Sequence, residues 1–149
     1  PERKYQLDQI VKNYPSLEVI FLDDRSLLAM AAADVVLLSS GTATLEAMLL
    51  KKPMVVSYRL GRLTYALISR MLKVKYVALP NLLADELLVP EFLEENATLE
   101  NISIEVMRLF NHPDRVSGLQ KRFEEIHKTL RCGGSAMAAK ALSELIDAP

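Results

Sequence analysis

The sequence predicts an α/β fold, in which a parallel sheet is covered by helices on both faces. Between residues 17 and 79, short runs rich in β-branched residues alternate with helical patterns. That alternation is typical of parallel strands joined by helical crossovers. After Pro90 the patterns are helical to the end of the chain. We therefore expect the sheet to be complete by about residue 80 and a helical C-terminal tail to follow.

The individual elements follow from hydrophobic periodicity and from Pro, Gly and capping residues. The expected strands are residues 17–22, 35–38, 54–58 and 74–79. The expected helices are residues 5–11, 25–33, 43–50, 63–72, 91–95, 99–111, 113–130 and 135–146. Right-handed crossovers place the functional loops at the carboxyl ends of the strands. Those loops are residues 23–24, 39–44, 58–62 and 80–84.

Length and composition are those of one domain. The chain has 149 residues, of which 50% are apolar, so it can bury a core. We find no repeat and no linker long enough to divide residues 1–149. The chain begins at Pro1 without Met, and its first residues have the pattern of the end of a helix. We expect it to be a fragment of a longer chain.

Charge is unevenly distributed along the chain. The net charge is −1, which gives no indication of a nucleic acid partner. Residues 47–84 nevertheless contain seven Lys or Arg residues and no Asp or Glu. This segment is either a surface for diphosphate, a phosphorylated substrate or anionic headgroups, or a pair of solvated helix ends.

Several classes of protein are disfavoured by the residues present. The single cysteine, Cys132, excludes an internal disulfide and fits a reducing cytoplasm. The two histidines are isolated, and no cluster has the spacing of metal ligands, so we expect no metal and no cofactor. No apolar run is long enough to span a membrane, and no signal peptide is visible.

A turn rich in small hydroxyl residues follows the expected strand 35–38. It consists of Ser39, Ser40, Gly41, Thr42, Ala43 and Thr44. A strand, a tight turn and a helix N-terminus in this order form an anion site, because the first helical N–H groups lack partners. Glu46 could accept hydrogen bonds from two sugar hydroxyls. The alternatives are an ordinary turn with Ser/Thr capping and a solvated first-turn carboxylate.

These residues also carry a resemblance to a known family. Residues 39–46 with 52–59, residues 76–84 and residues 130–134 resemble the donor half of lipid-A-disaccharide synthases. The resemblance is collinear from about residue 21 to residue 146. It implies a Rossmann-like parallel sheet sandwiched by helices, the carboxy-terminal half of a GT-B glycosyltransferase. It also implies that the helical tail, residues 113–147, crosses to the amino-terminal half.

The activity implied by the resemblance is that of a hexosyltransferase of lipid A biosynthesis. Such an enzyme condenses UDP-2,3-diacylglucosamine with 2,3-diacylglucosamine 1-phosphate (lipid X) to lipid A disaccharide 1-phosphate and UDP. It would be a cytoplasmic enzyme in peripheral contact with the inner membrane, and a homodimer is conceivable. The catalytic base is expected in the amino-terminal half. The chain alone should therefore bind UDP and transfer no sugar.

The resemblance also assigns roles to individual residues. The turn from Ser39 to Thr44 would bind the UDP diphosphate, and Glu46 would bind the ribose. The donor-site loops would contribute Tyr58, Arg59, Asn81, Leu82 and Glu94. From the residues alone, Asn81 could instead bond its own turn, and Arg59 could be a surface residue.

Two features depart from the family pattern or extend it. Asp85-Glu86 stands where a Gly and a basic residue are common, and Glu94 stands where Gln is usual, so contacts there are altered. Residues 60–74 combine apolar and basic side chains, which suits either a membrane edge or an ordinary half-buried helix.

Two other functions remain open from the sequence. One is another GT-B nucleotide-sugar enzyme, such as a peptidoglycan N-acetylglucosaminyl transferase or a UDP-sugar epimerase. The other is a non-catalytic nucleotide-sugar-binding subunit that works with a partner chain.

Overall fold

The centre of the molecule is a three-stranded parallel sheet. The computed structural model describes residues 2–39, 41–59, 75–131 and 133–146. The sheet consists of β1 (Val36–Leu38), β2 (Met54–Tyr58) and β3 (Glu91–Leu93), in the order β1-β2-β3. Val36 pairs with Met54, and Val56 pairs with Glu91. The parallel sheet confirms the predicted α/β class.

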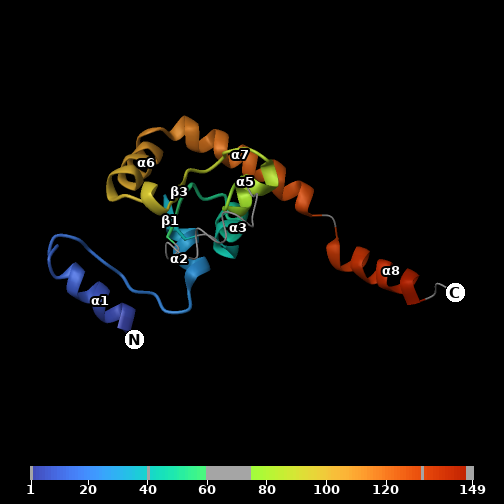
Figure 1. The fold of residues 1–149 in the computed structure, drawn as a ribbon, viewed down its shortest axis with the longest axis horizontal. Helices are drawn as coiled ribbons and strands as arrows, with labels where there is room; N and C mark the ends of the chain where they lie inside the picture. Colours follow the sequence, from blue (N-terminus) through green and yellow to red (C-terminus); the bar gives the residue numbers. More distant parts are fainter. Residues whose placement is uncertain (1, 40, 60–74, 132, 147–149) are drawn as a thin grey trace.

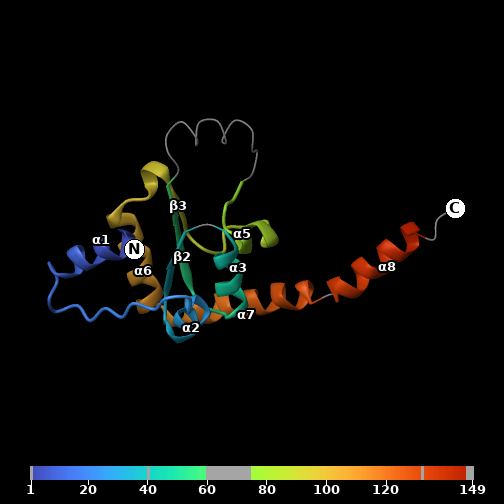
Figure 2. The ribbon, with the colours of Figure 1, turned by 90° about the horizontal axis from the view of Figure 1, so that it is seen from below.

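Helices cover both faces of this sheet. On one side lie α3 (Thr42–Leu49) and α5 (Leu79–Ala84), and on the other side lies α6 (Leu99–Asn111), which packs on β2 (Figure 2). The long helix α7 (Pro113–Leu130) contacts α3, α5 and α6. The short α2 (Ser26–Ala32) packs against α3. The predicted helices 99–111 and 113–130 are confirmed to the residue.

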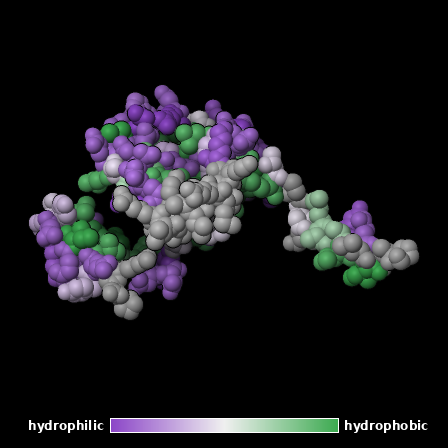
Figure 3. All heavy atoms as spheres, viewed as in Figure 1, coloured by the Kyte–Doolittle hydropathy of each residue, from purple (hydrophilic) through white to green (hydrophobic). Residues whose placement is uncertain are grey.

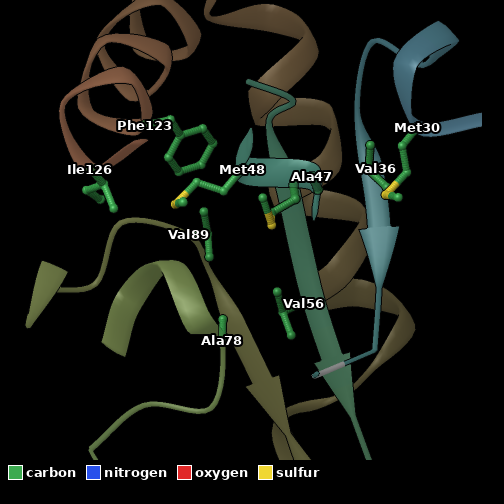
Figure 4. Close-up of a cluster of buried hydrophobic side chains, with 10 residues drawn as sticks. Met30, Val36, Ala47, Met48, Val56, Ala78, Val89, Phe123 and Ile126 are labelled. Carbon is green, nitrogen blue, oxygen red and sulfur yellow. The ribbon is translucent and has the colours of Figure 1, made fainter. Parts of the chain in front are cut away.

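The core joins the sheet to α3 and α7. Met48 of α3 and Phe123 of α7 are fully buried (Figure 4). The cluster is completed by Met30, Val36, Ala47, Met54, Val56, Ala78, Val89 and Ile126. Because Phe123 and Ile126 belong to it, α7 is an integral part of this domain.

The two ends of the chain lie apart from the core. Helix α8 (Gly134–Ile146) projects away from the sheet in both views (Figures 1 and 2), and α1 (Glu2–Val11) lies apart from it in Figure 1. Every residue of α8 whose side chain is described is exposed. Apolar surface is visible on both end segments (Figure 3), and it includes Met137, Leu142 and Ile146 on α8.

The structure corrects three predicted elements. Residues 17–22 have no strand partner among the described residues, and their side chains are exposed. The described part of 74–79 is not a strand either, because α5 begins at Leu79 with Pro80 in its first turn, where proline is favoured. Residues 91–95 are not a helix: they form β3 and the start of the 3₁₀ turn η1 (Glu94–Asn96).

Pairing with a neighbour explains the third correction. The segment from Glu91 to Leu93 lies beside β2, so the sheet was not complete at residue 80. Side-chain periodicity does not report such pairing, because a three-residue strand has too few positions to show an alternation. The predicted helix 63–72 lies outside the described residues.

Candidate functional site

The glycine turn lies where a parallel sheet places its ligand sites. It follows β1 directly, at the carboxyl end of that strand, and it leads into α3. Gly41 is the N-cap of α3, and its backbone angles are φ 116° and ψ −163°. This is a region of backbone space that essentially only glycine occupies. Ser40 lies outside the described residues.

The start of α3 has free space beside Gly41 and backbone donors without partners in their own helix. A Cβ built on Gly41 would meet nothing within 4 Å. The N-cap residue is a glycine, and no side chain of a described residue caps the helix. The N–H of Thr44 bonds the Gly41 carbonyl oxygen at 3.1 Å. The N–H groups of Thr42 and Ala43 precede it and have no carbonyl of their own helix to bond, so they carry the positive end of the helix dipole.

Glu46 lies one turn further along α3. Its side chain is half-buried, and it has no hydrogen bond or ion pair with any residue that the structure describes. An ionised carboxylate offers two acceptor oxygens. Glu46 is therefore available to a ligand that reaches past the start of the helix.

Two side chains predicted to contact a ligand are instead occupied by the protein. Thr44 is fully buried, and its hydroxyl donates to the Gly41 carbonyl oxygen at 2.7 Å. Asn81 is also fully buried, and its amide nitrogen donates to Val89 O and to Glu91 Oε1, each at 2.8 Å. Its oxygen accepts from the N–H groups of Leu88 and Val89. All the ordinary hydrogen-bonding capacity of Asn81 is therefore used internally.

This arrangement limits what the side chains of Asn81 and Thr44 can offer a ligand. The family resemblance placed both at a ligand, but in this structure neither has a proton left to donate to one. The internal hydrogen bonds of Asn81 are of the kind that its alternative role, bonding to nearby backbone, describes. Leu82 on the same helix α5 is 40% exposed and remains accessible.

The remaining predicted residues gather at the carboxyl ends of β2 and β3. Tyr58 pairs with Leu93 in the sheet register and is half-buried. Arg59 Nε donates to the Glu94 carbonyl oxygen at 3.2 Å. Glu94 adopts a positive φ of 49° directly after β3. The guanidinium of Arg59 therefore joins two loops at the same edge of the sheet as the glycine turn.

Sequence reasoning missed Glu91. Its carboxylate on β3 accepts hydrogen bonds from Val77 N–H at 2.9 Å and from Ala78 N–H at 2.8 Å, besides the one from Asn81. It thus places a negative charge at the N-terminus of α5, where the helix dipole favours one. The sequence around Glu91 does not reveal this role, because the three donors lie 10 to 14 residues earlier in the chain, in α5 or just before it.

The basic segment 47–84 is only partly free to bind anions. Lys51 pairs with Glu124 of α7 at 3.3 Å, so its charge is used within the protein. Lys75 lies 4.9 Å from the centre of the Tyr76 ring. The hydrogen bond with Tyr76 is the main cause that raises the pKa of Lys75. Three further cations of the segment lie outside the described residues: Arg62, Arg70 and Lys73.

The described residues provide neither a cluster of metal ligands nor a membrane-spanning helix. Among the described residues, no group of three or more His, Cys, Asp or Glu side chains could hold a metal ion. None of the helices in the described ranges has the length and apolar character that crossing a membrane requires.

Fold and site together define a class of protein. A parallel sheet with a glycine turn at a helix N-terminus is the arrangement with which Rossmann-like domains hold nucleotide phosphates. A comparison with known families narrows this class, because a family model described as lipid-A-disaccharide synthetase matches residues 1–145. The chain therefore belongs to the lipid-A-disaccharide synthetase family.

Individual relatives agree with the family model. The chain is 45% identical to a lipid-A-disaccharide synthase of Alcanivorax borkumensis over 146 residues, which is 98% of this chain and 38% of that protein. It is 44% identical to the one of Cellvibrio japonicus, over 97% of this chain and 38% of the relative. A Pseudomonas fluorescens relative is 47% identical, with 98% and 38% covered. The chain thus spans about two fifths of the length of these relatives.

Proposed function

We propose that this chain is the donor-binding half of a lipid-A-disaccharide synthase. The reaction transfers the 2,3-diacylglucosamine of a UDP-sugar to the hydroxyl of 2,3-diacylglucosamine 1-phosphate. The bond between the sugar and the diphosphate breaks, a glycosidic bond forms, and UDP leaves. Family membership and the relatives named above support this proposal. The observation that carries the site is Gly41 as the N-cap of α3 directly after a parallel strand.

The backbone at the start of α3 would stabilise the leaving diphosphate. The N–H groups of Thr42 and Ala43 point out of the helix end, so they can donate to phosphate oxygens as negative charge develops there. In other enzymes, one well-placed donor of this kind lowers the activation free energy by about 3 kcal/mol. The hydroxyls of Ser39, Ser40 and Thr42 would add side-chain donors. Thr44 would contribute through its position and not as a donor.

Glu46 would distinguish UDP from diphosphate alone. It lies one helical turn beyond the phosphate donors, half-buried and without an ion pair to a described residue. Its two carboxylate oxygens could accept hydrogen bonds from the two ribose hydroxyls. Arg59 and Tyr58, at the neighbouring strand end, would border the donor sugar together with Leu82 and Glu94.

The acceptor, the catalytic base and the membrane would lie beyond this domain. We place the acylated glucosamine 1-phosphate and the base in the amino-terminal half, which the family's greater length provides for. The exposed apolar side chains of α8 would pack on that half or on a second copy in a homodimer. Peripheral contact with the cytoplasmic face of the inner membrane would present the acylated substrates. These assignments rest on the family and on the exposed surfaces.

A titration with UDP tests the donor site. We expect the purified chain to bind UDP weakly, with amide chemical shifts that change between Ser39 and Glu46. With both acylated substrates present, we expect no disaccharide from this chain alone. Amide shifts that change elsewhere, and not in this turn, would contradict the assignment of the site.

The alternative functions have less support. The family match and the names of the relatives do not favour a peptidoglycan N-acetylglucosaminyl transferase or a UDP-sugar epimerase. A non-catalytic binding subunit would share the UDP site. It would be distinguished by the absence of transfer activity when a complete amino-terminal half is supplied with the chain.

A further inference from the structure

The hydroxyl of Thr44 connects the glycine turn to the start of α5. It donates to Gly41 O at 2.7 Å and accepts from the N–H of Leu79 at 3.2 Å. A hydroxyl has one proton, so Thr44 can make no further donation. The side chain is fully buried between the two helices. Thr44 is therefore the residue through which α5 can act on the turn.

The hydroxyl bond to Gly41 O, the shorter of the two that this oxygen accepts from Thr44, helps to fix the direction of a ligand-facing donor. Gly41 O and the N–H of Thr42 belong to the same peptide group, which is planar and trans. Holding the oxygen toward Thr44 consequently holds the Thr42 N–H in the opposite direction, out of the helix. Glycine at a positive φ has a wide range of backbone angles, so an external constraint on this peptide matters.

Glu91 fixes the other end of the connection. Its carboxylate accepts from Val77 N–H and Ala78 N–H, the two residues directly before Leu79. Asn81 donates to the same carboxylate and bonds the backbone of Val89, which ties α5 to the segment leading into β3. Hydrogen bonds to an ionised acceptor are stronger than neutral ones, so this end is well anchored.

We propose that Thr44 and Glu91 are positioning residues for the diphosphate donors of the glycine turn. Glu91 places the first residues of α5, the Leu79 N–H then orients the Thr44 hydroxyl, and that hydroxyl orients the Gly41–Thr42 peptide. This inference rests on the proposed function for its ligand. It goes further than that function because it states that β3, about 50 residues away in the chain, helps to align the glycine turn.

The first test replaces the hydroxyl without changing the volume much. We expect Thr44→Val to weaken UDP binding by roughly tenfold, because the Gly41 oxygen and the Leu79 N–H lose their shared partner. Thr44→Ser keeps the hydroxyl and should bind UDP within about threefold of the unaltered chain. The control Ile126→Val removes one buried methylene group on α7, lowers stability, and should leave UDP affinity unchanged.

Three results would overturn the proposal. The first is a Thr44→Val variant that is folded and binds UDP with the affinity of the unaltered chain. The second is a Thr44→Ser variant that binds UDP as weakly as Thr44→Val does. The third is an equal loss of UDP affinity in Ile126→Val, since it would show that loss of core packing alone weakens the site.

A measurement without ligand separates this inference from the proposed function. If the unaltered chain binds no UDP, the proposed function fails. The amide resonance and hydrogen exchange of Thr42 then decide the positioning role. We expect both to change in Thr44→Val and to stay near their original values in Thr44→Ser. An unchanged Thr42 amide in Thr44→Val would overturn the inference.

The second test examines the connection to β3. Glu91→Gln keeps one acceptor oxygen but places an NH₂ group beside the Val77 N–H, so we expect the amides of Leu79 and Thr42 to shift. If the two residues act in series, Glu91→Gln with Thr44→Val should lose less UDP affinity than the product of the single losses. A loss equal to that product would overturn the link. The exposed neighbour Glu95→Gln is the matched control, with no shift expected at Thr42.

Discussion

The two ends of α3 are built in opposite ways. At the C-terminal end, Lys51 adopts a positive φ of 59°, and its ammonium group bonds Leu49 O, His127 Nδ1 and Glu124. Gln120 of α7 also donates to the Lys51 carbonyl oxygen at 3.1 Å. At the N-terminal end, Gly41 has a positive φ, none of the described side chains caps the helix, and a Cβ on the glycine would meet no atom within 4 Å.

This difference separates a structural helix end from one that is available to a ligand. The C-terminal end is closed by side chains of α7, so its polar groups are satisfied within the protein. The N-terminal end is aligned by buried groups behind it, through Thr44, while its first N–H groups have no partner within the helix. A substitution at Gly41 should therefore lower ligand affinity, whereas a substitution at Lys51 should lower stability and leave ligand affinity unchanged.

The largest effect is expected from Gly41→Ala. The added methyl group meets no atom within 4 Å, so the cost is backbone strain alone. We expect UDP affinity to fall by at least about tenfold and the free energy of unfolding to fall by about 1–3 kcal/mol. Calorimetric titration and urea unfolding measure the two. Gly133→Ala is the control, because Gly133 also has positive φ and open space but precedes α8; its UDP affinity should not change.

The next effect distinguishes the nucleoside from the phosphates. Glu46→Ala should weaken UDP by roughly tenfold, since two charge-assisted hydrogen bonds are lost, and should change the affinity for inorganic diphosphate little. Competition binding with both ligands measures the ratio. An equal loss for UDP and diphosphate would show that Glu46 acts on the phosphates or on the helix, and the ribose role would be wrong.

A smaller effect is expected at the other end of the helix. Lys51→Ala removes the contacts to α7, and the partly exposed pair with Glu124 limits the loss of unfolding free energy to about 1 kcal/mol. UDP affinity should be unchanged. Lys128→Ala removes only the longer contact with Glu124, at 3.9 Å, and should cost less than Lys51→Ala. A drop in UDP affinity in Lys51→Ala would contradict the division between the two ends.

The smallest effect is a dependence on pH. The hydrogen bond from Lys51 is the main cause that lowers the pKa of Glu124 below its ordinary value of 4.5. The unfolded chain then binds a proton more readily than the folded chain, so this contribution is present above pH 4.5 and is lost as the pH falls below it. Urea unfolding at about pH 6 and about pH 3.5 should show a smaller difference in Lys51→Ala than in the unaltered chain. An identical difference in both would exclude this pair as a source.

The sequence predicted the elements that carry strong local signals. The strand 54–58 follows Pro53 and opens with three apolar residues, and the helix 99–111 begins after Thr98, whose hydroxyl accepts from Asn101 N–H. The glycine turn was predicted because its small residues lie between a strand and a helix. These signals act within a few residues, so a single sequence contains them.

The errors arose where distant partners decide the conformation. Residues 17–22 have the composition of a strand but pair with no described strand, while Glu91 to Leu93 became a strand because β2 lies beside it. The internal hydrogen bonds of Asn81 and Thr44 could not be predicted either, because their partners cannot be read from sequence. The carboxylate of Glu91 was missed for the same reason, since its role depends on where α5 begins.

A structure of the chain with UDP bound tests the central claim most directly. We expect the diphosphate to lie at the start of α3, within hydrogen-bond distance of the Thr42 and Ala43 backbone nitrogens, and the ribose to lie beside Glu46. UDP bound at another part of the surface, or Thr42 and Ala43 N–H groups bonded to protein atoms in its presence, would contradict the account.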